Sequence, residues 1–128
     1  MMGVKIVVHE KSNPSDPTAP KKWYASAVAN GDLTFRRLSK EVADGSTTVS
    51  DTDVLAVLND LIKLLCRHLS NGEIVRLGDF GTFQISVSSE GAETEEKFHA
   101  SMIKSSKVIF RPGIDLKEMQ KTLKFEKA

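Results

Sequence analysis

The chain has 128 residues, of which 40% are hydrophobic and 27% are charged, an ordinary composition for one soluble globular domain. Its 18 basic and 17 acidic side chains leave a formal net charge of +1, which argues against strong, unspecific nucleic-acid binding by overall charge alone. A single cysteine excludes an internal disulfide, and neither a signal peptide nor a long apolar run is found, so we expect a cytoplasmic protein with no membrane contact.

Two short strands are expected in residues 1–31, which we predict to be an extension in front of the main domain. Apolar and polar residues alternate within residues 1–10, and residues 23–28 form a second candidate strand before the turn signal at residues 30–31. Residues 11–20 contain three of the four prolines and predict an extended loop. We expect the first strand to join the edge of a sheet in the main domain or in a partner subunit.

Aromatic and basic residues adjoin at the beginning of the second strand, where Trp23 and Tyr24 follow Lys21 and Lys22. Basic side chains beside exposed aromatic rings can form a platform on which nucleic-acid bases stack. Aromatic residues at such a position more often pack against the domain that they begin. We expect packing, with the stacking platform as the alternative.

Two helices are expected next. Thr34 is a suitable N-cap for a helix that ends near residues 44–45. Ser50 is a suitable N-cap for a longer helix, which continues to about Ser70 and ends at the stop signal of residues 71–72.

The longer helix is apolar around most of its circumference. One stripe can face the domain's own sheet, and it consists of Val54, Leu58, Leu61 and Leu65. A second stripe needs another partner, and it consists of Leu55, Ile62, Cys66 and Leu69. A helix that is apolar on most sides is buried on most sides, and so small a chain has few other elements to cover it. We therefore expect a homodimer, with Cys66 as an inert buried thiol.

Three strands and a final helix complete the expected elements. The strands are Glu73–Leu77, Phe80–Val87 and Lys107–Phe110, with a polar, acidic segment between the last two. Gly78 and Gly81 lie where a side chain would block a chain reversal or a close backbone approach. The final helix is expected to begin near Gly113 and to carry Leu116, Met119 and Leu123 on one side.

Two motifs carry a family resemblance: Gly78-Asp79-Phe80-Gly81-Thr82-Phe83, and Phe110-Arg111-Pro112-Gly113 about 30 residues later. With the order of elements, they make residues 34–125 resemble the HU/IHF family of bacterial histone-like DNA-binding proteins, in the extended form of the Bacteroides group. The resemblance implies an α+β fold, an HU/IHF-like intertwined dimer with two N-terminal helices, a three-stranded antiparallel sheet with a protruding β-arm, and a C-terminal helix. The HU-like domain would then occupy residues 32–128.

The same resemblance implies architectural, largely sequence-independent binding of double-stranded DNA in the bacterial nucleoid, with contacts mainly to phosphates. The residues expected to contact DNA are Arg76, Lys97, Lys104, Lys107, Arg111 and Lys117. The residues expected at the dimer interface are Leu55, Leu58, Ile62, Leu65, Cys66, Leu69, Phe80 and Phe83.

The segment that should form the arm departs from the family pattern. Serines replace its alternating basic residues, the Arg-Asn-Pro wedge of the tip is missing, and residues 88–104 contain four glutamates but only two lysines. Phe98 or Met102 is a possible apolar wedge, although packing within the arm is the favoured interpretation. The alternative function is therefore an HU-fold interaction or scaffolding dimer that has lost strong DNA binding.

No catalytic or metal-binding pattern is found in the sequence. His9, His68 and His99 are scattered, and no nucleophile–base, paired-carboxylate or phosphate-loop motif is present. We expect a protein that is not an enzyme and has no cofactor, no metal and no small-molecule substrate.

Overall fold

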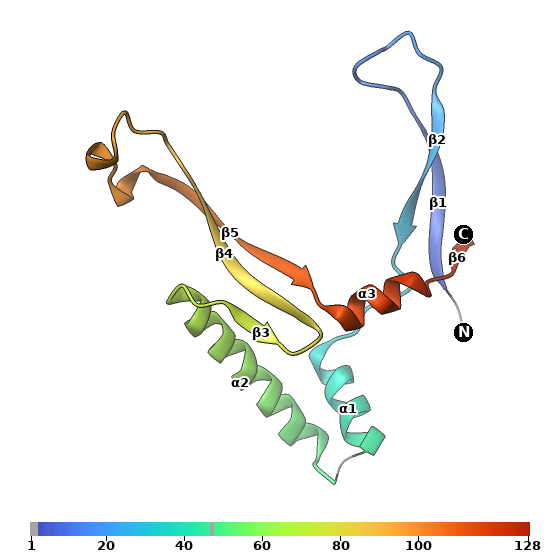
Figure 1. Ribbon diagram of the computed structural model, residues 1–128. Coiled ribbons are helices and arrows are strands. Elements are labelled where there is room, and N and C mark those ends of the chain that lie inside the picture. Colours follow the sequence, from blue (N-terminus) through green and yellow to red (C-terminus); the bar gives the residue numbers. More distant parts are fainter. Residues whose placement is uncertain (1–2, 47) are drawn as a thin grey trace. The chain divides into compact units, whose positions relative to one another are not determined.

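The computed structural model describes residues 3–46 and 48–128 (Figure 1). Its elements in chain order are β1 (Val4–Lys11), β2 (Lys22–Val28), α1 (Phe35–Ser46), α2 (Asp51–Ser70), β3 (Val75–Leu77), β4 (Gly81–Ser89), η1 (Glu95–Lys97), η2 (Ala100–Met102), β5 (Ile103–Pro112), α3 (Ile114–Lys121) and β6 (Phe125–Lys127). They divide into two compact units, the first formed by residues 1–34 and 119–128 and the second by residues 35–118. The fold is a mixed α+β fold, as expected.

The first unit is built on a three-stranded sheet with the order β2-β1-β6. β1 pairs with β2 in antiparallel fashion and with β6 in parallel fashion. The backbone N–H of Val4 donates to the carbonyl oxygen of Lys124 at 2.7 Å, and that of Ala128 donates to Ile6 at 2.8 Å. The expectation that the first strand joins the edge of the main sheet is therefore wrong, because β1 is the centre of a separate sheet.

The two adjacent aromatic residues of β2 are not packed. Trp23 is 65% exposed and Tyr24 is 49% exposed. The two side chains point to opposite faces of the sheet, because successive residues of a strand alternate. The expectation that they pack at the start of a domain is wrong for the structure described.

Local signals set the ends of α2. The side chain of Ser50 accepts a hydrogen bond from the backbone N–H of Asp53 at 3.1 Å, which confirms the predicted N-cap. Asn71 follows the last turn, and Gly72 has a φ of 81°, a conformation that glycine adopts without strain. α1 ends at Ser46, slightly beyond its expected end.

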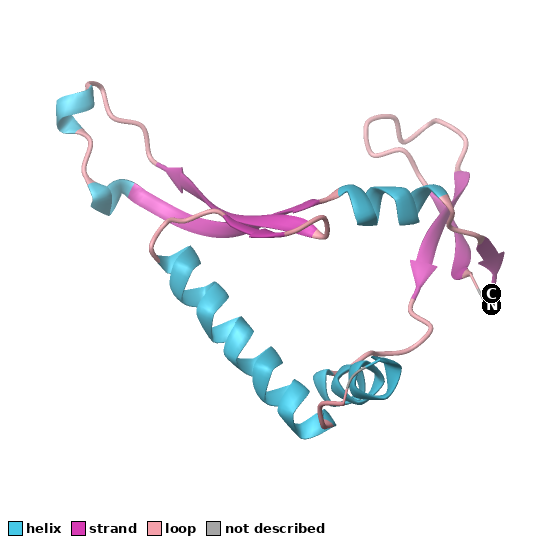
Figure 2. Cartoon of the chain, turned by 60° about the horizontal axis from the view of Figure 1, so that its bottom comes forward, coloured by secondary structure: helices cyan, strands magenta, loops and turns pink. Residues whose placement is uncertain are grey.

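The second unit contains the sheet β3-β4-β5, in which both pairs of strands are antiparallel. Gly78 makes the β3–β4 turn with a φ of 53°, as its predicted role requires. β5 begins at Ile103, whereas the sequence predicted a strand of only Lys107–Phe110, so that prediction is wrong. The serine-rich segments of β4 and β5 pair with each other as far as Ser89 and Ile103, which makes a long two-stranded arm (Figures 1 and 2).

The tip of this arm, residues 90–102, is held by short-range hydrogen bonds. The backbone N–H of Glu90 donates to Met102 at 2.9 Å, and that of Met102 donates to His99 at 2.9 Å. The Met102 sulfur lies 3.4 Å from the backbone nitrogen of His99, and its side chain is half-buried. Met102 thus packs within the tip, in agreement with the favoured interpretation, whereas Phe98 is 40% exposed.

The last helix is shorter than the sequence suggested. α3 ends at Lys121, so Leu123 lies beyond it and the predicted stripe through Leu123 is wrong. β6, which follows, was not predicted, because a strand of three residues gives too short a pattern to recognise. It is formed only by pairing with β1, which lies at the opposite end of the chain.

Two glycines allow close packing where β4, β5 and α3 meet. A Cβ on Gly113 would collide with the carbonyl oxygen of Asp79, and one on Gly81 would collide with the ring of Phe110. The backbone N–H of Gly113 donates to Phe80 at 2.8 Å, and that of Asp115 donates to Asp79 at 3.1 Å. The beginning of α3 is thereby fixed against the β3–β4 turn.

Replacement of Gly113 should therefore destabilise the protein. We expect Gly113→Ala to lower the free energy of unfolding by about 1–3 kcal/mol, because the added methyl group must displace backbone atoms. Urea unfolding at fixed protein concentration measures the change. Gly91→Ala is the control, because no atom lies within 4 Å of the place that its Cβ would take, and it should stay within about 0.5 kcal/mol of the parent. Equal midpoints for the two variants would contradict the packing argument.

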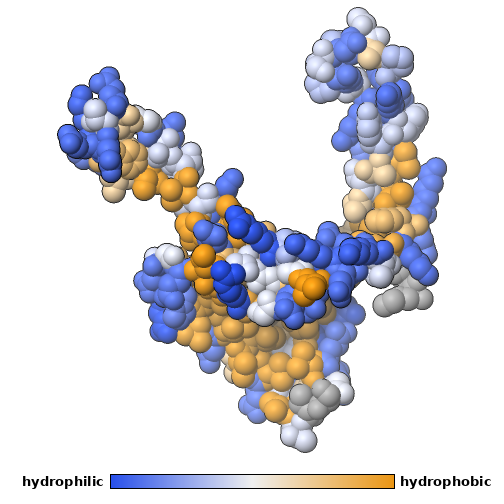
Figure 3. Space-filling model, in the orientation of Figure 1, coloured by the Kyte–Doolittle hydropathy of each residue, from blue (hydrophilic) through white to orange (hydrophobic). Residues whose placement is uncertain are grey.

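No hydrophobic side chain among residues 3–46 and 48–128 is buried. Ser39 is the buried side chain of this part of the chain, and its hydroxyl donates to the carbonyl oxygen of Phe35 at 2.6 Å. Figure 3 shows the apolar side chains gathered on the surface over α1 and α2. A soluble protein rarely exposes so large a hydrophobic surface unless something else covers it.

Candidate nucleic-acid interface

The register of the sheet β3-β4-β5 separates its side chains into two chemically different faces. One face is apolar, with Val75, Leu77, Phe83, Ile85, Val87, Val108 and Phe110. The other face, called the polar face below, carries Arg76, Thr82, Gln84, Ser86, Ser88, Ser105, Lys107, Ile109 and Arg111. No aspartate or glutamate occurs among the paired residues of the polar face.

Three of the predicted DNA-contacting residues meet on this polar face. Arg76 pairs with Thr82, and Thr82 pairs with Arg111, so the two arginines occupy one row across three strands. Neighbouring strands lie about 4.8 Å apart, which places the Cα atoms of the arginines about 10 Å from each other. Lys107 lies four residues from Arg111 on β5, about 13 Å along the strand. Its side chain is also exposed, as are both arginines.

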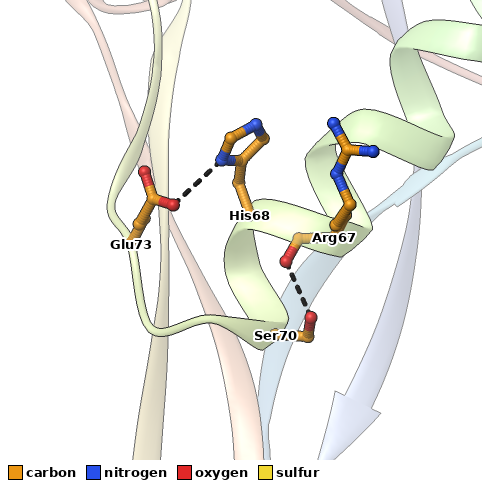
Figure 4. Close-up of polar contacts among 4 residues, drawn as sticks. All are labelled: Arg67, His68, Ser70 and Glu73. Carbon is orange, nitrogen blue, oxygen red and sulfur yellow. Dashed lines mark hydrogen bonds and ion pairs between the residues drawn. The ribbon is translucent and has the colours of Figure 1, made fainter.

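Polar contacts join the end of α2 to Glu73, which precedes β3 and Arg76 in the chain (Figure 4). The Nδ1 atom of His68 lies 3.0 Å from a carboxylate oxygen of Glu73, and the hydroxyl of Ser70 donates to the carbonyl oxygen of Arg67 at 2.7 Å. The backbone N–H of Glu73 also donates to His68, at 3.1 Å. Glu73 is close in sequence to Arg76, and these contacts hold its carboxylate and backbone against the end of the helix.

Aromatic packing supports the other side of the site. The ring centroids of Phe83 and Phe110 lie 4.8 Å apart, and those of Phe80 and Phe110 lie 5.9 Å apart. Phe83 and Phe110 also pair across β4 and β5 on the apolar face. This packing holds the register of the strands, and the register decides that Arg111 and Lys107 point to the polar face.

The other three predicted contact residues are elsewhere in the second unit. Lys97 lies in η1 at the arm tip, and its ammonium lies 3.3 Å from a carboxylate oxygen of Glu93. Lys104 lies at the bulge between Ser88 and Ser89, where the register shifts and no cross-strand partner faces it. Lys117 is exposed on α3. The sheet therefore brings together half of the predicted set.

The arm tip is acidic. Its exposed carboxylates are those of Glu90, Glu93, Glu95 and Glu96. The pair between Glu93 and Lys97 neutralises one of these charges, and the two residues are four positions apart. A DNA backbone that reached the tip would be repelled by the remaining charges.

The hydroxyl and amide side chains beside the cations were not predicted from the sequence. Thr82 pairs with Arg111, Ser86 pairs with Lys107, and Gln84 lies between these two rows on the polar face. Such groups can donate hydrogen bonds to phosphate oxygens. Their alternation with Phe83 and Ile85 was the signal that places them on one face.

The predicted dimer-interface residues divide into two groups. Ile62, Cys66 and Phe80 are exposed in the single chain. The half-buried ones are Leu55, Leu58, Leu65, Leu69 and Phe83. Cys66 is thus not buried by its own chain, which corrects that expectation for the single subunit.

A helical projection of α2 shows why its own chain covers it incompletely. At 3.6 residues per turn its apolar residues span an arc of about 200°. Most of the half-buried residues lie near the middle of this arc, and Val57, Leu61 and Leu64 form an exposed flank on one side. On the other side Ile62 and Cys66 are exposed, with the half-buried Leu55 between them. Leu61, expected to face the domain's own sheet, is 37% exposed.

Other kinds of site find little support in the described part of the chain. It contains no cluster of three or more metal-ligating side chains. Among the helices described, none is sufficiently long and apolar to cross a membrane.

Comparisons with known proteins agree with the fold. A model of the HU-HIG family, described as the HU domain fused to wHTH, Ig, or a glycine-rich motif, matches residues 2–127. A Bacteroides vulgatus crystal structure, named as a candidate bacterial DNA-binding protein, is similar with a TM-score of 0.67 and 13% identity. The similarity covers 97% of this chain and 47% of that one, so this chain spans about half the length of that relative.

A second solved structure with the same fold is that of Anabaena HU in a cocrystal with DNA. Its TM-score is 0.55 at 18% identity, and the similarity covers 70% of this chain and 99% of that chain. Both likenesses are at low identity and concern the fold. No curated protein matches the chain.

Proposed function

This chain belongs to the HU-HIG family of HU domains, and from that membership we propose that it is an architectural DNA-binding protein that acts as a homodimer without catalysis. The observation that supports this proposal best is the polar face of β3-β4-β5, which carries Arg76, Lys107 and Arg111 and no carboxylate. A cationic surface without acidic neighbours attracts a phosphate backbone and releases its counterions.

The side chains of the polar face favour contacts with the DNA backbone over base-specific contacts. Serine and threonine hydroxyls and two long guanidinium groups suit phosphate oxygens, which carry no sequence information. We propose Lys97, Lys104 and Lys117 as further phosphate contacts with smaller contributions. Lys97 already has a carboxylate partner in Glu93, which lowers its value as a phosphate ligand.

Homodimer formation is proposed from the uncovered hydrophobic surface. The single chain exposes 10667 Å², whereas two separate compact globules of the sizes of its two units would together expose about 8,000 Å². The difference is similar to the roughly 1,000–2,500 Å² that one subunit contributes to an obligate dimer interface. The exposed flanks of α2 and the exposed Phe80 are the surfaces that a second copy would cover, in an intertwined arrangement as in the related family.

A second candidate function is favoured by the acidic arm tip. An HU-fold dimer that scaffolds other proteins would not need a cationic tip, and the four glutamates there oppose DNA wrapping. The polar face distinguishes the two candidate functions, because a protein scaffold does not need three cations on a sheet face that carries no carboxylate. We therefore place DNA binding first, with contacts concentrated on the sheet and not at the tip.

A salt-titrated gel shift on linear, nicked and pre-bent duplexes tests the proposal. We expect binding to all three shapes at about 50 mM salt and a steep loss by about 200 mM, because phosphate contacts supply most of the affinity. The logarithm of the binding constant should fall linearly with the logarithm of the salt concentration. Absence of any shift at the lowest salt would favour the scaffolding function.

A further inference from the structure

The first unit contains a small surface pocket where β1 leaves its pairing with β2 for the hairpin loop. Its volume is about 240 Å³, and it is lined by Lys11, Asn13, Ala19, Pro20, Lys22 and Tyr24. This volume is below the roughly 300 Å³ at which pockets for whole drug-sized molecules begin. It suits one part of a longer ligand.

Two lysines face each other in this pocket without a counter-ion. Lys11 and Lys22 are direct partners in the β1–β2 register. Like charges in this position oppose strand pairing. Neither ammonium has an ion-pair partner among the residues that the structure describes. An anion between them would remove the repulsion.

Acidic residues are absent from the described lining of the pocket. Glu10 pairs with Trp23 on the opposite face of the sheet. Asp16 lies in the hairpin loop, where its carboxylate accepts hydrogen bonds from the backbone and hydroxyl of Thr18 at 3.2 Å and 2.7 Å. Glu126 pairs with Lys5 at the other end of β1, about 20 Å from Lys11 at 3.3 Å per residue. The pocket therefore has a local positive charge.

An exposed aromatic ring adjoins the two ammonium groups. Tyr24 pairs with His9 two residues along the strands from the Lys11–Lys22 pair, so these four side chains share one face of the sheet. Its ring is 49% exposed and lines the pocket. An exposed ring beside two cations is the combination by which proteins hold single-stranded nucleic acid, through base stacking and phosphate attraction.

We infer that this pocket is a second nucleic-acid site, which binds one nucleotide of a single strand. Lys11 and Lys22 hold its phosphate, and the base stacks on the ring of Tyr24. The site is separate from the polar face of β3-β4-β5 and does not depend on the duplex binding proposed above. It gives the N-terminal extension a role in contacting unpaired DNA or RNA.

The test is a two-dimensional ¹H–¹⁵N NMR titration of the full chain with an oligothymidylate of about four nucleotides, the low end of known single-strand site sizes. We expect the largest shifts at the amides of Lys11, Asn13, Lys22 and Tyr24. Inorganic phosphate is titrated separately. If phosphate alone gave the same shifts with the same affinity, base stacking would be excluded and the inference overturned.

Four variants separate the parts of the site. Lys11→Gln/Lys22→Gln should abolish the shifts, whereas the matched control Lys5→Gln/Lys127→Gln removes the same charge from the same sheet and should leave the affinity unchanged. Tyr24→Leu should weaken binding at least about fivefold, and Tyr24→Phe should restore it, because stacking needs a ring and no hydroxyl. Unchanged affinity in the lysine double variant, or equal weakening by Leu and Phe, would overturn the inference.

Failure of this inference is distinguishable from failure of the proposed duplex binding. Replacement of Arg76, Lys107 and Arg111 by glutamine should leave the oligothymidylate shifts in the pocket intact. If shifts in the wild-type chain occurred only around those three residues, the pocket would be excluded while the duplex site remained. If the chain bound no duplex but the pocket shifted, only the duplex proposal would fail.

Discussion

Replacement of the three cations of the polar face, as Arg76→Gln/Lys107→Gln/Arg111→Gln, should weaken duplex DNA binding at about 0.1 M salt by roughly 100- to 500-fold for each subunit that touches the duplex. When the logarithm of the binding constant is plotted against the logarithm of the salt concentration, each phosphate contact contributes about 0.9 to the size of the slope. Loss of three contacts should therefore lower the slope by about 2.7 for each subunit that touches the duplex. Fluorescence anisotropy with a labelled duplex at several salt concentrations measures both quantities.

The matched control removes three positive charges from other parts of the surface. Lys40, Lys63 and Lys121 are exposed, and they lie on α1, α2 and α3. Lys40→Gln/Lys63→Gln/Lys121→Gln gives the same net charge as the first triple variant, and its effect on affinity should be less than about fivefold, because distant exposed charges are screened by salt. Equal losses in the two triple variants would mean that overall charge, and not the polar face, controls binding.

The sequence predicted the elements of the second unit well where strong local signals mark them. Ser50 caps α2 as expected, and Gly78 adopts the positive φ that its turn requires. Gly81, predicted to allow a close backbone approach, lies where a Cβ would collide with Phe110 and with the backbone of Arg111. These signals are local or steric, so they can be recognised without knowledge of the fold.

The elements that were missed depend on pairing between distant segments. β5 extends toward the arm tip because its serines pair with those of β4, and serine has little strand preference of its own. β6 is a strand only because β1 lies beside it. No pattern in a single segment contains that information, since propensity is weaker than tertiary pairing in such short strands.

The sheet register places half of the candidate DNA-contacting set on one face. Arg76 alternates with Val75 and Leu77, which indicates the outward face of a strand from sequence alone. Arg111 lies outside the predicted strand Lys107–Phe110, so its face was not predicted. The sequence alone does not show that the two arginines lie in one row, because this depends on the register of three strands. The exposure of Trp23 and Tyr24 was not predictable either, because an aromatic residue in a short strand is equally compatible with a covered and an open sheet face.

The dimer proposal makes a second strong prediction at α2. Leu61 is 37% exposed in the single chain, so a carboxylate there would be tolerated in a monomer. At the interface of a dimer, Leu61→Glu would bury two unpaired charges, which is expected to raise the dimer dissociation constant by at least about 100-fold. Analytical ultracentrifugation over a range of micromolar concentrations measures it.

The matched control for this prediction is Ala56→Glu on the same helix. Ala56 is exposed near the centre of the polar side of α2, and its replacement changes the charge by the same amount. The control should remain a dimer, because its carboxylate stays in water.

The thermal midpoint of the wild-type chain should also rise with protein concentration, since association stabilises the folded state by mass action. A wild-type monomer at micromolar concentration, or a Leu61→Glu variant as dimeric as the control, would show that a second copy does not cover the hydrophobic flanks of α2.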